Sequence, residues 1–353
     1  MGTVCGGCIV WYGDTYDKVR EFIMWAWVVV FMKSNGKQDF YREWKNKKTI
    51  FHYRLKGWGV VFFLILFLPF IVTVVWSGGG EGEEGDFINK KAESGIRVRL
   101  QGESGVVLSM EEYLYGCLPA VIPVEYEMEC LKAQAVLLRT CLIGQYMEGL
   151  QNGSGWLEED SYLNRVTLQA LWGTDYADYY EKIKQAVDET RGVYIVYDGS
   201  PIVVSYFRVS AGRTRDGGEV LDGEYPYLKI VECGKDYLSD DYLSQIILKG
   251  SEMETLLGGK LDRVVIDSAG YCRMVVTEEG VQKSGEWIRE QLKLASTHIT
   301  FTQNADDYIL TVRGLGHGLG MSQFAANEMA REGKSYDIIL SNFFHNISLD
   351  KYE

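Results

Sequence analysis

The chain has 353 residues, with 36 Lys plus Arg against 49 Asp plus Glu, and its formal net charge is −13. That length suits two ordinary domains or one domain with extensions. A surface that binds nucleic acid needs clustered positive charge to neutralise phosphates, so the charge balance argues against a nucleic-acid partner. Hydrophobic residues make up 46% of the chain and charged residues 24%, which is the composition of a globular protein and excludes a wholly disordered one.

The seven cysteines do not follow the spacing of a disulfide framework. One tight pair, Cys5 and Cys8, has the spacing of a metal or redox site, but no second pair and no histidine lies near it. Cys117, Cys130 and Cys141 lie among apolar residues, so we expect them to fill the core. The cysteines therefore assign no function, and the role of the tight pair stays open.

The longest uncharged apolar stretch runs from Trp58 to Trp76. Its 19 residues carry no charge, and a tryptophan stands at each end. About 20 apolar residues cross a bilayer core as a helix, and Trp favours the membrane interface. Pro69 would kink such a helix but is tolerated within a membrane. The sequence therefore predicts a single transmembrane helix over 58–76.

The charges beside this helix predict its orientation. Eight basic and two acidic residues lie between Lys33 and Lys56, whereas four acidic residues follow soon after the helix. The positive-inside rule then places residues 1–57 in the cytoplasm and residues 77–353 outside the cell membrane. The Gly/Glu-rich composition after the helix predicts a flexible linker over 77–95.

Beyond the linker, Ile96 to Leu100 alternates as a strand does, and a second short strand is expected at 106–108. Ser109 is expected to cap a helix that carries two glutamates in its first turn. Pro123 is expected at the first position of a long helix that continues to about residue 148.

The remaining pattern alternates helices and strands without repeated βαβ units, which predicts a mixed α+β body of helices and antiparallel strands over 96–353. A subdomain is expected within 200–300. The elements expected after residue 150 are helices at 175–190, 240–249, 284–295, 322–332 and 335–344, a hairpin of 193–197 and 202–207 turned by Asp198-Gly199, and strand pairs within 262–277 and 298–313.

Two long segments resemble a known family. The first, Gly116 to Thr140, reads GCLPAVIPVEYEMECLKAQAVLLRT, and the second, Gly314 to Ala330, reads GLGHGLGMSQFAANEMA. Both are similar to hallmark segments of the stage II sporulation protein D family (SpoIID/LytB), and they occur in the family's order. The resemblance extends over residues 96–345, with its core at 105–195.

The resemblance implies action on the peptidoglycan of the bacterial cell wall during sporulation or wall remodelling. Enzymes of the family are lytic transglycosylases, in which one carboxylic acid donates a proton to the glycosidic oxygen. Its carboxylate then accepts a proton from the sugar's own 6-hydroxyl, which closes an anhydro ring. Since water is not the nucleophile, the second carboxylate of an ordinary glycosidase is dispensable.

The sequence departs from the family at the acid itself. Val121 stands two residues before Pro123, where the family has its catalytic glutamate, and valine cannot transfer a proton. The nearest carboxylates belong to Glu125 and Glu127. Glu125 would lie roughly 6 Å from position 121 if both residues were helical. Glu125 is therefore a candidate catalytic residue, and the alternative is that it merely favours the positive end of a helix.

The resemblance also bears on metal binding. Some members carry a His-x-x-Cys stretch that resembles a zinc site, but the matching positions here are Phe207 and Ser210. Phenylalanine cannot bind zinc and serine binds it poorly, and the chain has only four histidines. We expect no metal and no cofactor.

Candidate glycan-binding residues come from both segments. His317 lies between glycines, where the backbone can approach a ligand closely, and Ser322 and Gln323 add groups suited to sugar hydroxyls or N-acetyl groups. The alternative is a tight turn that holds a packed histidine. Arg139 from the first segment completes the predicted set, although it could equally be a salt-bridged helix residue.

The leading hypothesis is a single-pass membrane protein whose outer part binds peptidoglycan glycan strands and, if it retains an acid, cleaves them. The alternative is a non-catalytic scaffold that recruits or activates another cell-wall hydrolase, as the family's amidase-enhancer relatives imply. The lost glutamate leaves both open.

Overall fold

The computed structural model describes residues 3–5, 8–10, 95–100, 106–151, 157–159, 161–221 and 223–352. Two short strands near the N-terminus, β1 (Thr3–Cys5) and β2 (Cys8–Val10), pair antiparallel and are described by their backbone alone. The helix predicted over 58–76 lies outside the described residues, and within them no helix is long and apolar enough to cross a membrane.

A three-stranded sheet begins the described part of the body. β3 (Arg97–Leu100) lies between β4 (Val107–Ser109), which it pairs antiparallel, and β5 (Leu157–Glu159), which it pairs parallel. Val98 and Leu100 are buried while the two arginines that alternate with them are exposed, because successive side chains of a strand point to opposite faces. The strands predicted at 96–100 and 106–108 are confirmed.

Helix α4 (Met110–Val121) begins where the sequence predicts. Ser109 accepts a hydrogen bond from the backbone N–H of Glu112, and the Glu112 carboxylate accepts from the backbone N–H of Ser109 at 3.0 Å. This capping box satisfies two backbone donors that a helix start otherwise leaves without partners.

The long second helix begins later than predicted. Helix α5 (Met128–Gln151) starts five residues after Pro123, so the predicted start at this proline is wrong. Residues before a proline favour an extended backbone, and Ile122 has φ −140° and ψ 145°. The chain then turns, with the Tyr126 N–H donating to the Pro123 carbonyl at 3.2 Å. α4 and α5 are therefore separated by a non-helical turn over 122–127.

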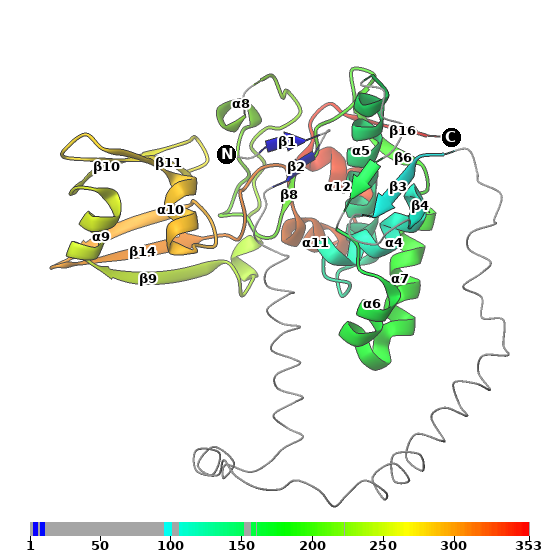
Figure 1. The fold of residues 1–353 in the computed structure, drawn as a ribbon, viewed down its shortest axis with the longest axis horizontal. Helices are drawn as coiled ribbons and strands as arrows, with labels where there is room; N and C mark the ends of the chain where they lie inside the picture. The colour runs from blue at the N-terminus through cyan, green and yellow to red at the C-terminus, as the bar shows by residue number, and fades with distance from the viewer. Residues whose placement is uncertain are drawn as a thin grey trace, which may run out of the picture. The chain divides into compact units, whose positions relative to one another are not determined.

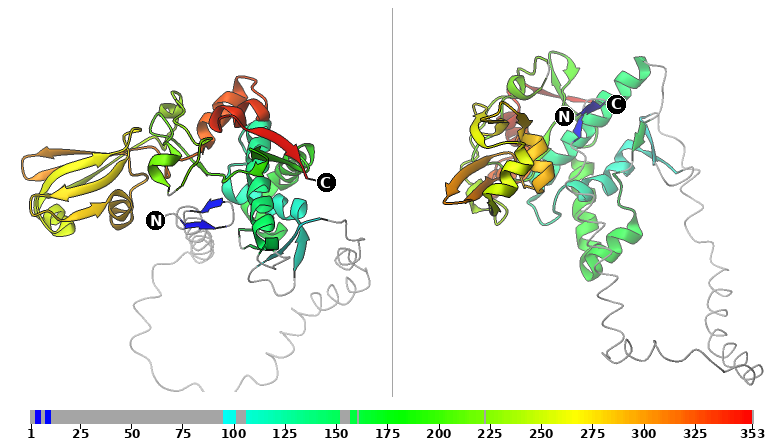
Figure 2. Two further views of the ribbon diagram at one scale, coloured as in Figure 1. Left: turned by 90° about the horizontal axis from the view of Figure 1, so that it is seen from above. Right: turned by 60° about the vertical axis from the view of Figure 1, so that its left-hand side comes forward.

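Helix α5 forms the centre of the body. It packs against α4, α7 (Tyr176–Glu189), α11 (Gln323–Arg331) and α12 (Tyr336–Phe343), and Figures 1 and 2 show the last two beside it. Most of its first half is buried, and its apolar residues belong to the main hydrophobic core, as expected for a helix surrounded by other elements. The predicted helices 175–190, 322–332 and 335–344 are confirmed, whereas α6 (Arg165–Trp172) and the 3₁₀ turn η2 (Gly173–Asp175) were not expected.

The predicted hairpin is correct at its turn and wrong in its second strand. β6 (Val193–Tyr197) and β7 (Ser200–Pro201) meet at Asp198 and Gly199, whose φ angles are 49° and 75°. The chain then leaves β6, because β8 (Tyr206–Phe207) pairs in parallel with β15 (Met321–Ser322). β6 pairs on its other side with β16 (Ser348–Lys351).

A lobe with its own hydrophobic core lies within residues 243–313, shifted from the subdomain expected at 200–300. It contains two three-stranded antiparallel sheets, in the orders β13-β14-β9 and β10-β11-β12 (Figure 1). Its elements are β9 (Leu243–Lys249), α9 (Gly250–Leu257), β10 (Leu261–Ile266), β11 (Cys272–Thr277), β12 (Gln282–Ser284), α10 (Gly285–Leu292), β13 (Ile299–Asn304) and β14 (Asp307–Arg313).

The lobe confirms the strand pairs predicted within 262–277 and 298–313 and the helix predicted at 284–295. The helix predicted at 240–249 is wrong. Those residues form β9, which pairs along all seven residues with β14. Hydrogen bonds to β14, a strand some sixty residues later, outweigh the local helical pattern. Strand preference depends strongly on packing against neighbouring strands.

Short elements connect the lobe to the body, namely α8 (Gly217–Val220) and η3 (Asp236–Leu238). A buried ion pair fixes the junction, with Arg215 Nε 2.6 Å from Asp267 Oδ2. Apart from the parallel pairs β3–β5 and β8–β15, the strand pairs of the described residues are antiparallel. The predicted α+β class is confirmed.

Candidate functional site

The two segments that resemble the family meet at position 121. Val121 is the last residue of α4, and its carbonyl accepts a hydrogen bond of 2.8 Å from Nε2 of Gln323, the first residue of α11. The last carbonyls of a helix have no partner within it, so Gln323 supplies one from 202 residues away. The family's acid position therefore lies directly against the second hallmark segment.

A second side chain of α11, that of Asn327, accepts a hydrogen bond from the backbone just before α5. Asn327 Oδ1 accepts a hydrogen bond of 2.7 Å from the backbone N–H of Glu127, whose carbonyl accepts the first bonds of α5. Gln323 and Asn327 are four residues apart and share one face of α11. One helix face thus holds both ends of the 122–127 turn.

The amide of Gln323 has a fixed direction. A carbonyl can only accept, so the Gln323 NH₂ group faces Val121 and also donates to Gln134 Oε1 at 3.1 Å. The NH₂ group of Gln134 is then directed elsewhere, where it is buried and finds no acceptor among the described residues. The turn is therefore backed by a polar network rather than by apolar packing alone.

The half-buried side chains at this turn include an aromatic ring and two cations. The Arg208 guanidinium lies 5.5 Å from the ring centroid of Tyr126, a cation–π distance. Lys182 donates to the Val124 carbonyl at 2.8 Å. Burial lowers the pKa of Lys182, and the carboxylates of Glu127 and Glu125 act in the opposite direction. Sequence reasoning missed Tyr126 and Arg208 as surface groups, although the aromatic residue of the first motif signalled Tyr126.

Glu125 lies in the turn and is exposed. The distance of roughly 6 Å expected between Glu125 and position 121 assumed a continuous helix, and that premise is wrong because residues 122–127 are not helical. A catalytic role for Glu125 stays a prediction.

Arg139 is fully buried and bonded on all sides. Its Nε and Nη2 donate to the two carboxylate oxygens of Glu111, each at 2.8 Å, and other N–H groups donate to the carbonyls of Val187 and Val193. A bidentate arginine–carboxylate pair of this kind fixes α5 to the start of α4. The structure gives Arg139 an internal role and no exposed surface with which to contact a sugar.

Ser322 and Gln323 are likewise internal. Ser322 is fully buried, where it caps α11 and donates to Asp236 Oδ2 at 2.8 Å. Burial raises the pKa of Asp236, against hydrogen bonds from Ser210 and Ser322 that lower it. Gln323 is 2% exposed. Direct contact of Ser322 and Gln323 with glycan stays a prediction, but their polar groups already have protein partners.

His317 is packed by glycines on both sides of it. Gly316 and Gly318 have φ angles of 109° and 79°, and a Cβ atom on Gly318 would lie 2.5 Å from the ring of Tyr271. Only glycine has both the required backbone angle and the required space there. The glycines that the sequence analysis associated with a ligand instead allow close contact within the protein.

Both ring nitrogens of His317 have backbone partners. Nδ1 accepts from the Leu319 N–H at 3.1 Å, so Nε2 carries the proton and donates to the Tyr206 carbonyl at 3.0 Å. Burial, with a smaller effect of Arg215, lowers the pKa of His317 to about 3. The imidazole is therefore neutral at physiological pH. Its contact with glycan stays a prediction.

The low pKa of His317 predicts that the protein loses unfolding free energy when the pH is lowered. Because the pKa is about 6.5 in an unfolded chain and about 3 here, the unfolded chain binds a proton between these values that the folded chain does not. Stability is then complete above pH 6.5 and falls on acidification, by about 2 kcal/mol between pH 7 and pH 5. Urea unfolding at both pH values should show that this part of the loss is absent in His317→Gln. Equal losses in parent and variant would contradict the assignment.

The positions compared with a zinc site carry other contacts. The Phe207 ring packs on His317 with centroids 5.6 Å apart, and the Ser210 N–H donates to Asp236 Oδ2 at 2.6 Å. Within the described ranges, no cluster of three or more His, Cys, Asp or Glu side chains could hold a metal ion.

Known proteins are similar to this chain over much of its length. Residues 103–197, which include α4, the 122–127 turn and α5, match the family described as SpoIID, stage II sporulation protein. Stage II sporulation protein D of Bacillus subtilis (strain 168) is 31% identical over 266 residues, which cover 72% of this chain and 78% of that protein. The chain belongs to the stage II sporulation protein D family.

Two further relatives extend the comparison. Stage II sporulation protein D of Bacillus amyloliquefaciens is also 31% identical over 266 residues, covering 72% of this chain and 77% of that protein. The amidase enhancer of Bacillus subtilis (strain 168) is 23% identical over 302 residues, covering 68% of this chain and 40% of that protein. Family membership supports a function in sporulation or the cell wall.

Proposed function

We propose that this SpoIID-family chain is a membrane-anchored protein whose outer part binds peptidoglycan glycan strands, with little or no cleavage of its own. The observation that carries the proposal is the geometry at Val121. Gln323 bonds to the Val121 carbonyl and Asn327 to the Glu127 N–H, so the turn at the acid position is supported, while the acid itself is replaced by valine. A supported turn that carries no proton donor at this position favours binding over turnover.

The contact surface of this proposal is the 122–127 turn. Tyr126 is half-buried, and one side of its ring is covered by the Arg208 guanidinium. Aromatic rings pack on the apolar faces of sugars, and guanidinium N–H groups donate to hydroxyl, amide or carboxylate oxygens. Among the described residues no carboxylate forms an ion pair with Arg208, so its donors are not committed to a charged partner.

We expect Tyr126→Ala and Arg208→Gln each to weaken binding to purified glycan strands about tenfold, because each removes one contact worth roughly 1 kcal/mol or somewhat more. A pull-down with the full-length chain in detergent measures this. Tyr237→Ala is a matched control, since Tyr237 is 64% exposed on η3 and lies outside the turn. Unchanged binding in both variants, with the fold intact by circular dichroism, would remove the turn from the binding surface.

A second candidate function is activation of another cell-wall hydrolase or amidase. The similarity to a protein named amidase enhancer favours it, as does the missing acid. Adding the chain to an amidase digesting purified cell walls distinguishes the two. A faster release of peptides by a chain that does not retain glycan strands would favour the scaffold function.

The location outside the membrane rests on the basic residues before Trp58 and the acidic ones after Trp76. Protease added to intact protoplasts should therefore degrade residues 77–353 and leave a short, membrane-bound N-terminal fragment. A C-terminal part that survives until the membrane is permeabilised would reverse the proposed orientation.

A further inference from the structure

Asp236, the first residue of η3, is a fully buried carboxylate that forms no ion pair with any cation of the described chain. Both of its hydrogen bonds reach one oxygen, because Oδ2 accepts from the Ser210 N–H at 2.6 Å and from the Ser322 hydroxyl at 2.8 Å. The other oxygen, Oδ1, is buried and finds no donor among the described residues. An unpaired buried charge lowers stability, so the contribution of Asp236 lies in the two groups that it holds in place.

The bond to Ser210 fixes the segment that carries Arg208. Directly before Arg208, β8 pairs with β15, and two residues after it the Ser210 N–H is bound to Asp236. Arg208 therefore lies between two anchored points of the backbone. From there its guanidinium covers the ring of Tyr126 at 5.5 Å.

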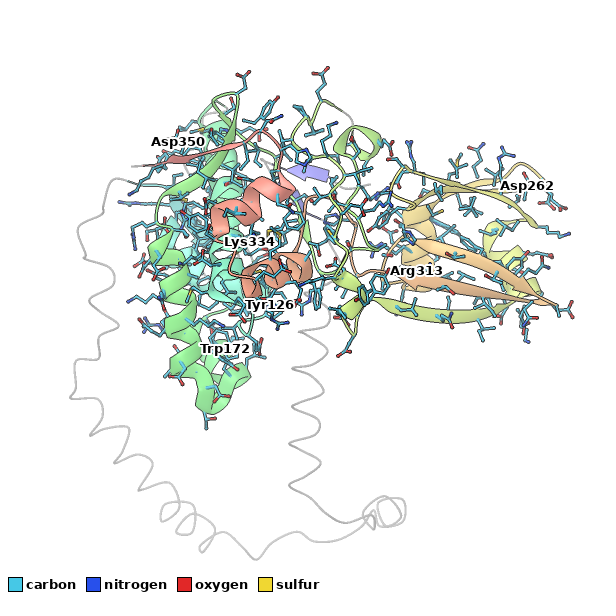
Figure 3. All side chains as sticks on the ribbon, turned by 180° about the vertical axis from the view of Figure 1, so that it is seen from behind. Tyr126, Trp172, Asp262, Arg313, Lys334 and Asp350 are labelled. Carbon is cyan, nitrogen blue, oxygen red and sulfur yellow. The ribbon has the colours of Figure 1, made fainter. Side chains whose placement is uncertain are left out.

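The bond to Ser322 fixes α11. Ser322 is the N-cap of this helix, so its hydroxyl ties Asp236 to the start of α11. The same helix holds the 122–127 turn through two of its side chains. Figure 3 shows Tyr126, which belongs to this turn, beside α11. One carboxylate oxygen thus connects the segment of Arg208 with the helix that supports Tyr126.

The remaining side-chain contacts printed between η3 and α11 are weaker. Lys235 pairs with Glu332 and, at 3.9 Å, with Glu328, but the Lys235 side chain is 48% exposed. Exposed ion pairs of this kind contribute little, whereas buried hydrogen bonds to a charged acceptor are stronger. Asp236 is therefore the main link between η3, the Arg208 segment and α11.

We propose that Asp236 is a positioning residue for glycan binding, because its Oδ2 keeps Arg208 and Tyr126 at the spacing in which one sugar strand contacts both. The inference rests on the proposed function. Asp236 is buried and cannot touch the ligand, so it acts through the backbone of Ser210 and the cap of α11. Without the shared acceptor the two side chains would move relative to each other, and binding would have to restore their order at a cost in affinity.

The geometry predicts different results for two substitutions at this residue. Asp236→Leu removes the acceptor, and we expect it to weaken binding of purified glycan strands by the full-length chain in detergent about fivefold, roughly the worth of one net hydrogen bond. In Asp236→Asn the amide oxygen takes the place of Oδ2 and keeps both bonds, while the NH₂ group takes the place of the unpartnered Oδ1. This variant should bind as the parent does.

A double-mutant cycle separates positioning from a general loss of stability. If Asp236 acts through Arg208, Asp236→Leu should weaken binding much less in an Arg208→Gln background than in the parent. Thr140→Val is the matched control, because it removes another buried acceptor of a backbone N–H, that of Ile195 at 2.9 Å. It should lower the resistance to urea and leave strand binding unchanged.

All variants are compared where circular dichroism shows them folded. If Asp236→Leu does not fold, Asp236→Ser replaces it with the same expected result, since its shorter side chain cannot reach both donors.

The outcomes separate this inference from the function on which it rests. If the parent binds no strands, the proposed function fails and this inference fails with it. If the parent binds strands and folded Asp236→Leu binds equally well, the positioning role alone is wrong. The positioning role is also wrong if Asp236→Asn binds as weakly as Asp236→Leu, or if Asp236→Leu weakens binding equally in the parent and in Arg208→Gln.

Discussion

Val121→Glu is expected to create or greatly increase cleavage of glycan strands by this chain. The backbone at position 121 is already held at the end of α4 by Gln323, and the turn that follows is held by Asn327. The substitution therefore adds a carboxylic acid to a supported position. General acid–base catalysis is typically worth about 10²–10⁴-fold, which is large enough to measure above the background of the parent. Soluble products ending in an anhydro sugar are the readout.

Two controls make this result specific. Val121→Gln has nearly the same shape as Val121→Glu but cannot transfer a proton, so it should remain at the level of the parent. Glu125→Gln tests the other candidate acid. If the parent already releases anhydro products and Glu125→Gln abolishes them, Glu125 serves as the acid despite its place in the turn. If both the parent and Val121→Glu are inactive while strands still bind, the chain is a binding protein whose surface has diverged from catalysis.

Arg139→Met is expected to cost about 3–5 kcal/mol of unfolding free energy, the largest loss of stability among the changes considered. Glu111 is 8% exposed, and the guanidinium is its charged partner at 2.8 Å through two parallel bonds. Removing the cation leaves a buried carboxylate that still accepts a hydrogen bond from the backbone N–H of Gly192 at 3.2 Å but has lost its charged partner. Urea unfolding monitored by circular dichroism measures the loss.

An exposed ion pair provides the control. Arg191 and Asp188 form a pair of 2.9 Å with both side chains exposed to water, so Arg191→Gln should cost only about 0–1 kcal/mol. Combining Arg139→Met with Glu111→Leu should recover much of the loss, because no unpaired charge is then buried. If Arg139→Met is no worse than Arg191→Gln but abolishes glycan binding, Arg139 contacts the ligand as the sequence predicted, and the internal role is wrong.

Local signals in the sequence were sufficient where the deciding residues are neighbours. Ser109 and Glu112 form the capping box three residues apart, and Asp198 and Gly199 adopt the positive φ angles of a tight turn. The helix at 284–295 was likewise predicted from its periodic pattern, and the structure shows that Ser284 caps it. These elements depend on hydrogen bonds and backbone preferences within a few residues, so the amino-acid order contains most of the information that determines them.

Elements whose hydrogen-bond partners lie far away in the sequence were determined only by the tertiary structure. Residues 243–249 are a strand because β14 pairs with them. The sequence of this segment alone does not indicate which strand it pairs with. Pro123 favours a break after α4, but the two ends of the 122–127 turn are held by Gln323 and Asn327 of the other hallmark segment. A sequence pattern shows which residue types are present but not which groups they meet after folding.

At the candidate site, too, some features could be predicted from the sequence and others only from the tertiary structure. The sequence alone determined the family resemblance and the loss of the acid at Val121, because both depend only on residue identity and spacing. It could not determine that Arg139 and His317 are enclosed, since a polar side chain in a motif can face either a ligand or the protein. Burial and internal hydrogen bonds enclose these two residues, whereas Tyr126 and Arg208 are half-buried at the turn.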